Sequence, residues 1–261
     1  MVSKRADAED PVQRIERLLG DPWKEKLAGA TWRAVEGALN ALLDGKRADA
    51  IPALVRWLDH PSVEVSGTAA DVLLAYDAPT ALEALAVRCG TVMRYPPQAS
   101  SGPRGYQTRC VLACIKADPA GAYDRLLPLC EGVRRDPTLD DPWVQAIFLV
   151  LSLSVMSKSW VRQAGLGDLP QREPRWLDLA FELSGLTGKR LAIAGPELLM
   201  SVGDPRALRA YARAVRGMGA AHVASFTSYR GIRGAPFLAL AEEPEFADIA
   251  PALRALATQL G

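Results

Sequence analysis

The residues of this chain that are best suited to bind an anionic group are four arginines with helical spacing. They are Arg206, Arg209, Arg213 and Arg216. At about 100° per residue they fall on one side of a helix, and none of them has an acidic residue three or four positions away within it. A guanidinium group presents a fork of N–H donors that matches a carboxylate or a phosphate. The spacing therefore predicts an anion-binding stripe.

The segment that follows the stripe extends the same chemistry with hydroxyl groups and further arginines. These residues are Ser225, Thr227, Ser228, Tyr229, Arg230 and Arg233. Residues 187–234 hold 8 basic and 2 acidic side chains, a net charge of +6, whereas residues 1–90 hold 11 basic and 14 acidic ones, a net charge of −3. We therefore expect a protein partner with an acidic surface to dock on a set of seven residues: Arg206, Arg209, Arg213, Arg216, Tyr229, Arg230 and Arg233.

The structural alternative to an anion-binding stripe is a solvated face, on which the arginines only form ion pairs within the protein. In that case the arginines of the stripe pair with carboxylates of the neighbouring helical unit, such as Glu182 or Glu197, and ion pairs of this kind contribute little to stability. The sequence leaves both interpretations open.

Residues for catalysis or metal binding are few. The two histidines, His60 and His222, are too few for a histidine-rich metal site, and His60 lies in an Asp–His–Pro turn between two helices. The segment Gly185–Lys189 resembles a phosphate-binding loop, but the first glycine of that motif is absent and Arg190 stands where a hydroxyl group must bind magnesium. We expect no catalytic residue, no metal and no cofactor.

The four cysteines lie at or near apolar positions of helices. They are Cys89, Cys110, Cys114 and Cys130. Such positions are typical of reduced core residues. A four-thiolate zinc site is the alternative, although the spacing lacks the paired C-x2-C pattern of structural zinc sites.

Six apolar quartets with the spacing i, i+3, i+4, i+7 predict the helices that position these residues. The quartets are Ile51/Leu54/Val55/Leu58, Leu82/Leu85/Ala86/Cys89, Tyr123/Leu126/Leu127/Cys130, Trp176/Leu179/Ala180/Leu183, Leu208/Tyr211/Ala212/Val215 and Leu253/Leu256/Ala257/Leu260. All but the last follow an acidic residue and a proline. The acidic side chain is expected to cap the helix, and proline fits its first turn because the N–H there has no intrahelical partner.

A helix that recurs in this way cannot bury its apolar stripe alone, so neighbouring copies must stack. The sequence therefore predicts an all-α fold, an α-solenoid with N- and C-terminal capping helices. Residues 1–45 would form the N-terminal cap, with one helix on Val12, Ile15 and Leu19 and a longer one that starts after Asp21-Pro22 and is lined by Trp23, Leu27, Ala30, Ala34, Ala38 and Leu42. Residues 46–261 would form one continuous structural unit that ends in a capping helix, Pro251 to Leu260.

Other segments either interrupt this array or bear on the location of the protein. Residues 94–106, 159–173 and 216–236 are expected to be irregular, and the glycines and prolines of the first and third argue against helices there.

The uncharged run Pro142 to Ser157 is too short for a membrane-spanning helix, which needs roughly 20 apolar residues. It therefore predicts a buried central helix. Residues 1–10 lack the apolar core of a secretory signal. With a net charge of +1, the expectation is a cytoplasmic protein without a membrane partner.

The segment AIPALVRWLDHPSVEVSGTAADVLLAYDAPTALEALAVRC, from Ala50 to Cys89, resembles the short HEAT-like repeats of phycobilisome-lyase-related proteins. VGDPRALRAYARAV, from Val202 to Val215, is similar to a second copy of the repeat start. One departure is Ser66-Gly67, where that family often has Arg or Lys. The resemblance implies a right-handed α-solenoid that mostly holds protein partners, with minorities that bind nucleic acid or assist cofactor attachment.

The function expected from the sequence is therefore that of a non-catalytic adaptor or inhibitor. The alternative is a protein that binds the nucleic-acid backbone, since an arginine-rich face with tryptophans is similar to that of the alkylpurine DNA glycosylases built on HEAT-like repeats. Asp140, Asp141 and Trp143 would be the candidate residues, although no motif aligns. A third reading, suggested by the repeat family alone, is a lyase subunit for cofactor attachment.

Overall fold

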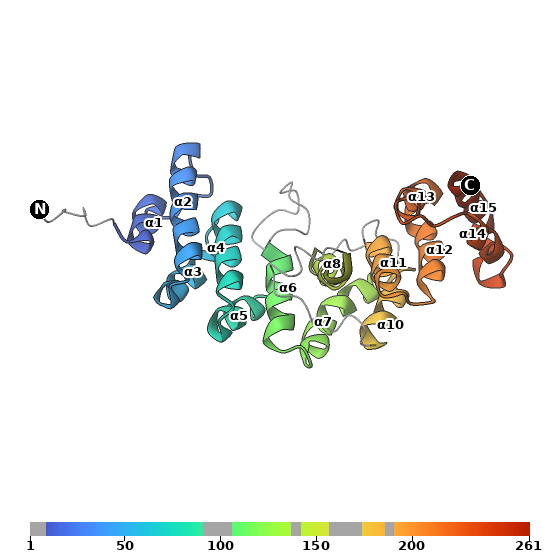
Figure 1. Ribbon diagram of the computed structural model, residues 1–261, viewed down its shortest axis with the longest axis horizontal. Helices are drawn as coiled ribbons and strands as arrows, with labels where there is room; N and C mark the ends of the chain where they lie inside the picture. Colours follow the sequence, from blue (N-terminus) through green and yellow to red (C-terminus); the bar gives the residue numbers. More distant parts are fainter. Residues whose placement is uncertain (1–8, 91–105, 137–141, 157–173, 186–190) are drawn as a thin grey trace, which may run out of the picture. The chain divides into compact units, whose positions relative to one another are not determined.

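The computed structural model describes residues 9–90, 106–136, 142–156, 174–185 and 191–261 (Figure 1). Every regular element within these ranges is a helix, so the prediction of an all-α fold is confirmed. Contacts group the chain into two compact units, Met1–Ala117 and Asp118–Gly261. The division into a cap of residues 1–45 and an array of residues 46–261 stays a prediction.

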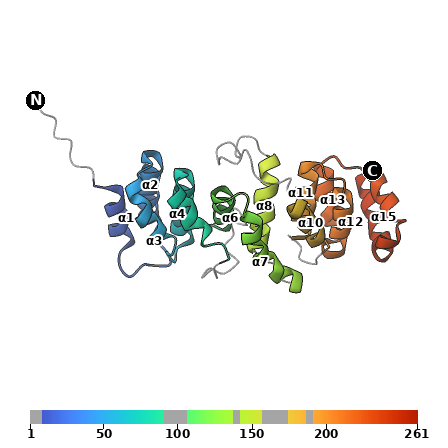
Figure 2. The same cartoon turned by 90° about the horizontal axis from the view of Figure 1, so that it is seen from below.

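The first unit is a succession of helices in which each contacts its near neighbours along the chain. Its elements are α1 (Pro11–Leu19), α2 (Gly29–Gly45), η1 (Ala48–Ala50), α3 (Ile51–Trp57), α4 (Val63–Tyr76), α5 (Pro79–Ala86) and α6 (Tyr106–Ala117). Helix α2 packs against α1 and α4, and α4 also packs against α3, α5 and α6. Both ribbon views show α4 lying between its neighbours in chain order (Figure 2).

The second unit follows the same principle. Its elements are α7 (Ala122–Arg135), α8 (Pro142–Met156), α10 (Pro174–Leu183), α11 (Leu191–Val202), α12 (Ala207–Met218), α13 (Ala220–Tyr229), α14 (Ala235–Leu240), η2 (Pro244–Ile249) and α15 (Ala250–Leu260). Helix α11 packs against α8, α10 and α12, whereas α12 also packs against α13, α14, η2 and α15.

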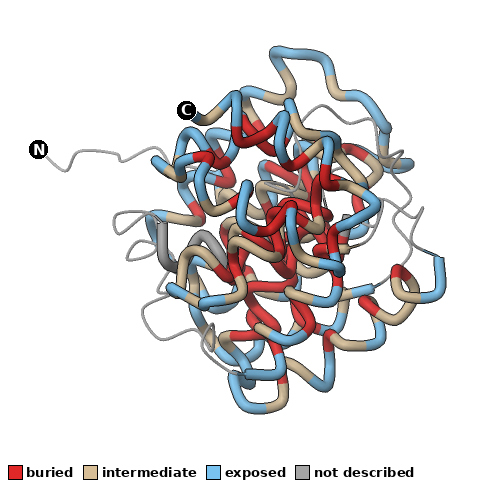
Figure 3. Tube along the Cα trace, turned by 90° about the vertical axis from the view of Figure 1, so that its right-hand side faces the viewer, coloured by how far each residue is buried: buried red, intermediate tan, exposed pale blue. Residues whose placement is uncertain are grey.

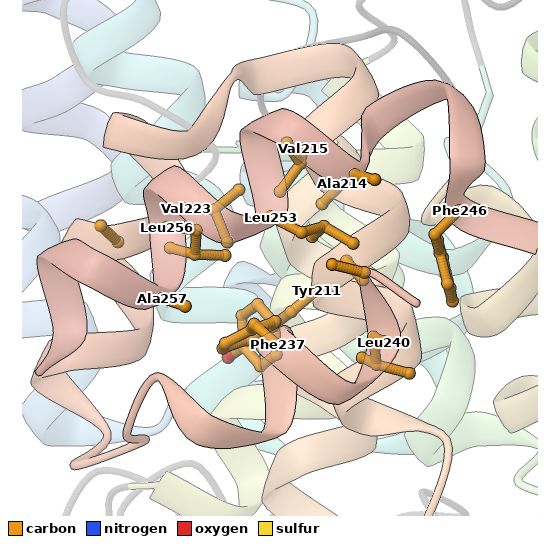
Figure 4. Close-up of a cluster of buried hydrophobic side chains, with 14 of the residues drawn as sticks. Tyr211, Ala214, Val215, Val223, Phe237, Leu240, Phe246, Leu253, Leu256 and Ala257 are labelled. Carbon is orange, nitrogen blue, oxygen red and sulfur yellow. The ribbon is translucent and has the colours of Figure 1, made fainter. Parts of the chain in front are cut away.

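The predicted apolar stripes form the core of each unit. Every quartet contains at least two buried side chains, and no quartet residue is exposed. Figure 3 shows buried and exposed stretches alternating along the helices, as expected when one side of each helix faces its neighbours. In the second unit, Tyr211, Phe237 and Phe246 are fully buried and join a cluster to which α12, α13, α14, η2 and α15 all contribute (Figure 4).

The expected starts of the helices are confirmed in part. Proline lies in the first turn of α1, α3, α5 and α15. Asp10 caps α1 by accepting hydrogen bonds from the backbone N–H groups of Val12 (2.9 Å) and Gln13 (3.3 Å). The prediction is wrong at α7 and α12 and also at α3 and α5, because none of these starts has a side-chain cap. At α3 and α5, Asp49 binds Arg47 instead, and Asp77 ends α4 in the left-handed conformation, with φ of 55°.

The start predicted for the second N-terminal helix is also wrong. Asp21-Pro22 does not begin a helix, and α2 starts only at Gly29. Its buried stripe consists of Val35, Ala38, Leu39 and Leu42. Ala38 and Leu42 belong to the predicted stripe, whereas Ala34 is only partly buried and Ala30, in the first turn of the helix, is exposed.

Two other expectations from the sequence concern α8 and the turn that contains His60. In α8, the side chains from Trp143 to Phe148 are all buried, as expected of a central helix. His60 is fully buried in the turn before α4, where its Nδ1 accepts a hydrogen bond from the backbone N–H of Ser62 at 3.0 Å. Burial lowers the pKa of His60, so that this imidazole is neutral at pH 7.

The cysteines are free thiols, as expected of reduced core residues. Cys110, Cys114 and Cys130 are buried, and Cys89 is partly exposed. Burial raises the pKa of the Cys110 thiol to about 12. Among the described residues, no group of three or more His, Cys, Asp or Glu side chains could hold a metal ion. No helix in the described ranges has both the length and the apolar character needed to cross a membrane.

Truncation of a stripe residue should destabilise the protein. Leu54 is fully buried at the centre of its stripe, so Leu54→Ala should lower the free energy of unfolding by about 2–5 kcal/mol. Val87, which is 56% exposed in the same unit, provides the matched control, because Val87→Ala should change it by less than about 0.5 kcal/mol. Denaturant titration of both variants measures the difference, and equal losses would show that Leu54 is not a core residue.

Candidate partner-binding surface

Helix α12 presents the predicted arginine stripe on the side opposite its core residues. Tyr211, Ala214 and Val215 are buried, whereas Arg209, Arg213 and Arg216 keep between 27% and 40% of their side-chain surface exposed. Arg206 lies at the N-cap of the helix. The amphipathic pattern inferred from the sequence is therefore present.

The first two arginines of the stripe bind carboxylates from other segments. Arg206 contacts Asp178 on α10 at 2.5 Å and Asp204 at 2.9 Å. Arg209 contacts Glu243 at 2.6 Å and Glu245 at 2.9 Å through two different nitrogens. Both guanidinium forks are thus already occupied within the protein.

The other two arginines both lie near carboxylates of η2, and Arg213 also contacts α10. Arg216 donates two parallel hydrogen bonds to Asp248, at 2.9 and 2.8 Å, and a third to the backbone carbonyl of Glu245. This bidentate geometry is the strongest that arginine makes with a carboxylate, and it lowers the pKa of Asp248. Arg213 donates to the carbonyl of Phe181 at 3.2 Å and lies 3.4 Å from Glu245.

The guanidinium groups of the stripe lie close to two aromatic rings. The guanidinium carbon of Arg213 lies 4.4 Å from the centre of the Phe181 ring, and that of Arg206 lies 5.6 Å from it. Arg209 and Arg216 flank the Phe246 ring at 6.0 and 5.7 Å. Distances within about 6 Å allow attraction between the cation and the ring quadrupole.

These contacts favour the structural alternative for the stripe. The partners are not the carboxylates suggested by the sequence, because Glu182 binds Arg134 and Glu197 binds Arg230. The arginines instead join α12 to α10 and to η2. An acidic partner could bind them only by displacing carboxylates that are already in place.

Arg230 has a structural contact of its own. Its Nε donates to Glu197 on α11 at 3.1 Å, and the side chains of both residues are less than one-fifth exposed. The hydroxyl group of Tyr211 on α12 donates to the other oxygen of Glu197 at 2.5 Å. Burial raises the pKa of Tyr211, and the hydrogen bond to Glu197 raises it further. The three side chains fasten the end of α13 to α11 and α12.

The segment expected to be irregular contains a helix, so the sequence prediction for residues 216–236 is wrong. Gly219, with φ of 79°, separates α12 from α13, and Gly231, with φ of 69°, follows the end of α13. The glycines are thus confined to the boundaries, because only glycine adopts these angles without strain. Between them, Val223, Ala224 and Thr227 are buried and form the inner side of α13.

The outer side of α13 is exposed and partly aromatic. Phe226 is 37% and Tyr229 is 82% exposed, and His222 and Ser225 on the same side are exposed as well. Arg233 follows the helix, is exposed, and pairs with no acidic residue in the described ranges. We call His222, Ser225, Phe226, Tyr229 and Arg233 the α13 surface.

Some candidate residues of the nucleic-acid interpretation cannot be placed. Of its candidates, Asp140 and Asp141 lie outside the described residues. Trp143 is buried in α8, with 6% of its surface exposed. It is therefore a core residue and offers little surface on which a base could stack.

The residues that hold the arginines are not apparent from the sequence. Phe181, Glu243, Glu245, Phe246 and Asp248 come from segments about 30 positions away along the chain. The sequence does contain one indication of this pairing, because residues 205–241 contain no acidic side chain and are followed directly by the acid-rich segment 242–248.

Comparison with known proteins found no match: no family model, no curated protein and no solved structure matches the chain.

Reversal of charge in the middle of the stripe should destabilise the second unit. In Arg209→Glu/Arg213→Glu, the new carboxylates would face Glu243 and Glu245, so the free energy of unfolding should fall by roughly 1–3 kcal/mol. Arg233→Glu is the matched control and should leave it unchanged within about 0.5 kcal/mol. A thermal melt of each variant measures the effect, and a double variant as stable as the wild type would show that the stripe is only solvated.

Proposed function

We propose that the chain is a cytoplasmic, non-catalytic α-solenoid of HEAT-like repeats that binds an acidic protein partner as an adaptor or inhibitor. The pattern of contacts within each unit supports the repeat architecture. Helix α4 packs against helices no more than two positions away in chain order, and α12 packs mainly against α11 and the elements that follow it, while its arginines reach α10. Contacts restricted to near neighbours are characteristic of repeat proteins, which use extended surfaces to bind their partners.

The observation that carries the proposal is the exposure of the α13 surface. Tyr229 and Phe226 are two of the four large apolar side chains that are exposed in the described part of the chain, and they lie three positions apart on one helix. Tyrosine and arginine are enriched among the residues that dominate binding energy at protein interfaces. Tyr229 and Arg233 therefore have the chemistry and the exposure of interface anchors.

The charge of this region favours an acidic partner. Residues 205–241 contain six arginines and no acidic residue. The four arginines of the stripe and Arg230 are each paired with a carboxylate. Within this region, the positive charge left to attract a partner is then that of Arg233, four positions after the exposed Tyr229 in the chain. Of the seven residues expected to bind a partner, we retain these two.

The proposal predicts that Tyr229→Ala/Arg233→Glu abolishes capture of the partner. The wild-type protein and this variant would be used as baits in extract from the native host, and the protein bound by the wild type would then be purified. Loss of a central aromatic anchor and reversal of a charge should weaken its binding at least about 30-fold, because such residues contribute 2 kcal/mol or more. The melting temperature should stay unchanged, since neither side chain is buried.

The control is Arg14→Glu/Val87→Ala, which changes an exposed arginine and an exposed apolar residue of the first unit. This control should bind the purified partner as the wild type does. Equal binding by both variants, or equal loss in both, would contradict the proposal. Capture of nucleic acid in place of protein, lost steeply with added salt, would favour the nucleic-acid alternative.

A further inference from the structure

A shallow pocket of about 440 Å³ lies in the first unit. It is lined by the last turn of α1, the segment that follows it, and α3. The lining residues are Glu16, Arg17, Gly20, Asp21, Trp23 and Arg56. Nothing in the proposed docking of a partner on α13 accounts for it.

The two arginines of the pocket are already paired with carboxylates. Arg17 donates to both oxygens of Glu9, at 2.9 and 2.8 Å. Arg56 forms an ion pair with Glu16, which also accepts a hydrogen bond from the indole N–H of Trp57 at 2.9 Å. The positive charge that the pocket presents to a ligand is therefore largely cancelled.

Carboxylate oxygens of the pocket remain available as hydrogen-bond acceptors. The carboxylate of Asp21 is exposed, and no described residue pairs with it. Glu16 uses one oxygen for both of its contacts, so its second oxygen is open. The lining residues hold two carboxylates and two guanidinium groups, and Arg17 is bound to Glu9 as well, so no net positive charge of the pocket opposes a cation.

Trp23 supplies an aromatic wall that no cation occupies. Its ring is packed against the ring of His60, with centroids 4.9 Å apart. Because burial lowers the pKa of His60, this neighbour is a neutral imidazole. No arginine or lysine among the described residues stacks on the Trp23 ring, although tryptophan is the aromatic side chain that attracts cations most strongly.

We propose that this pocket binds an alkylammonium group, held by the carboxylates of Asp21 and Glu16 and by the ring of Trp23. An ammonium group has three donors and no acceptor, which matches a site whose open groups are carboxylate oxygens and an aromatic face. Either a small free amine or a lysine side chain of a bound protein could supply the group. The site is independent of the α13 surface.

The test is a titration of the full chain, labelled with nitrogen-15, that follows the indole N–H resonance of Trp23. Trp23→Phe assigns this resonance, because its signal alone disappears. Cadaverine serves as the free amine, and lysine with both backbone ends blocked serves as the side chain. We expect a saturable shift of the Trp23 resonance with an ammonium probe, and none with glutarate, a dianion of similar length, at the same ionic strength.

The source of the ammonium group follows from which probe binds more tightly. Tighter binding of blocked lysine identifies a protein side chain, and tighter binding of cadaverine identifies a free amine. In both cases Asp21→Asn should weaken binding at least about fivefold, since it removes the open carboxylate and preserves the shape of the side chain. Asp44→Asn, at an exposed aspartate of α2 that does not line the pocket, should bind as the wild type does.

Three outcomes would overturn the proposal. These are the absence of a saturable shift with both amines, an equal shift with glutarate, and unchanged affinity in Asp21→Asn. The indole resonance of Trp57, which donates to Glu16, reports in the ligand-free spectra of the wild type and of Asp21→Asn whether this part of the fold stays intact. A loss of binding with an unchanged Trp57 signal is therefore assigned to the carboxylate of Asp21.

Discussion

The structure depends on one constraint, namely that a helix with a single apolar stripe can bury it only against its neighbours. Each quartet faces inward for this reason, and the distance between helices is set where their backbones meet. At Gly195 a Cβ atom would lie 2.3 Å from the carbonyl oxygen of Ala180, and at Gly234 it would lie 2.1 Å from that of Ala257. Contacts this short exclude any side chain. The pairs α10–α11 and α14–α15 therefore approach more closely than larger residues would permit.

Close packing of the stripes also explains the role of the arginines on α12. Their helix contains no acidic residue, yet its charge must be balanced where it lies beside α10 and η2. The balance comes from Asp178, Glu243, Glu245 and Asp248, and the rings of Phe181 and Phe246 give the guanidinium groups an apolar surface on which to lie. Single exposed ion pairs contribute little, but a network of several charges fixes the angle between neighbouring elements more firmly than any one pair could.

The sequence predicted local structure better than long-range pairing. Quartet spacing located the helices because the period of 3.6 residues is a property of the backbone itself. The predicted start of α2 is too early, because Asp21-Pro22 has the composition of a helix start but is not followed directly by an apolar stripe. Helix α13 is not predicted from the sequence, because the glycines at its two boundaries indicate an irregular segment. The carboxylates that bind Arg209 could not be assigned, since pairing across more than 30 residues depends on how α12 and η2 pack.

Helix α13 has a buried side, which packs it into the second unit, and an exposed side. Val223, Ala224 and Thr227 are buried on its inner side, and Arg230 fastens its end to Glu197. Tyr229 contributes almost no buried surface, because 82% of it is exposed, and burial is the source of most of the stabilisation that an aromatic side chain provides. Tyr229, one helical turn from the exposed Phe226, therefore adds little to folding. In the proposed function its contribution is contact with another molecule, and the buried side of α13 holds it in place for that contact.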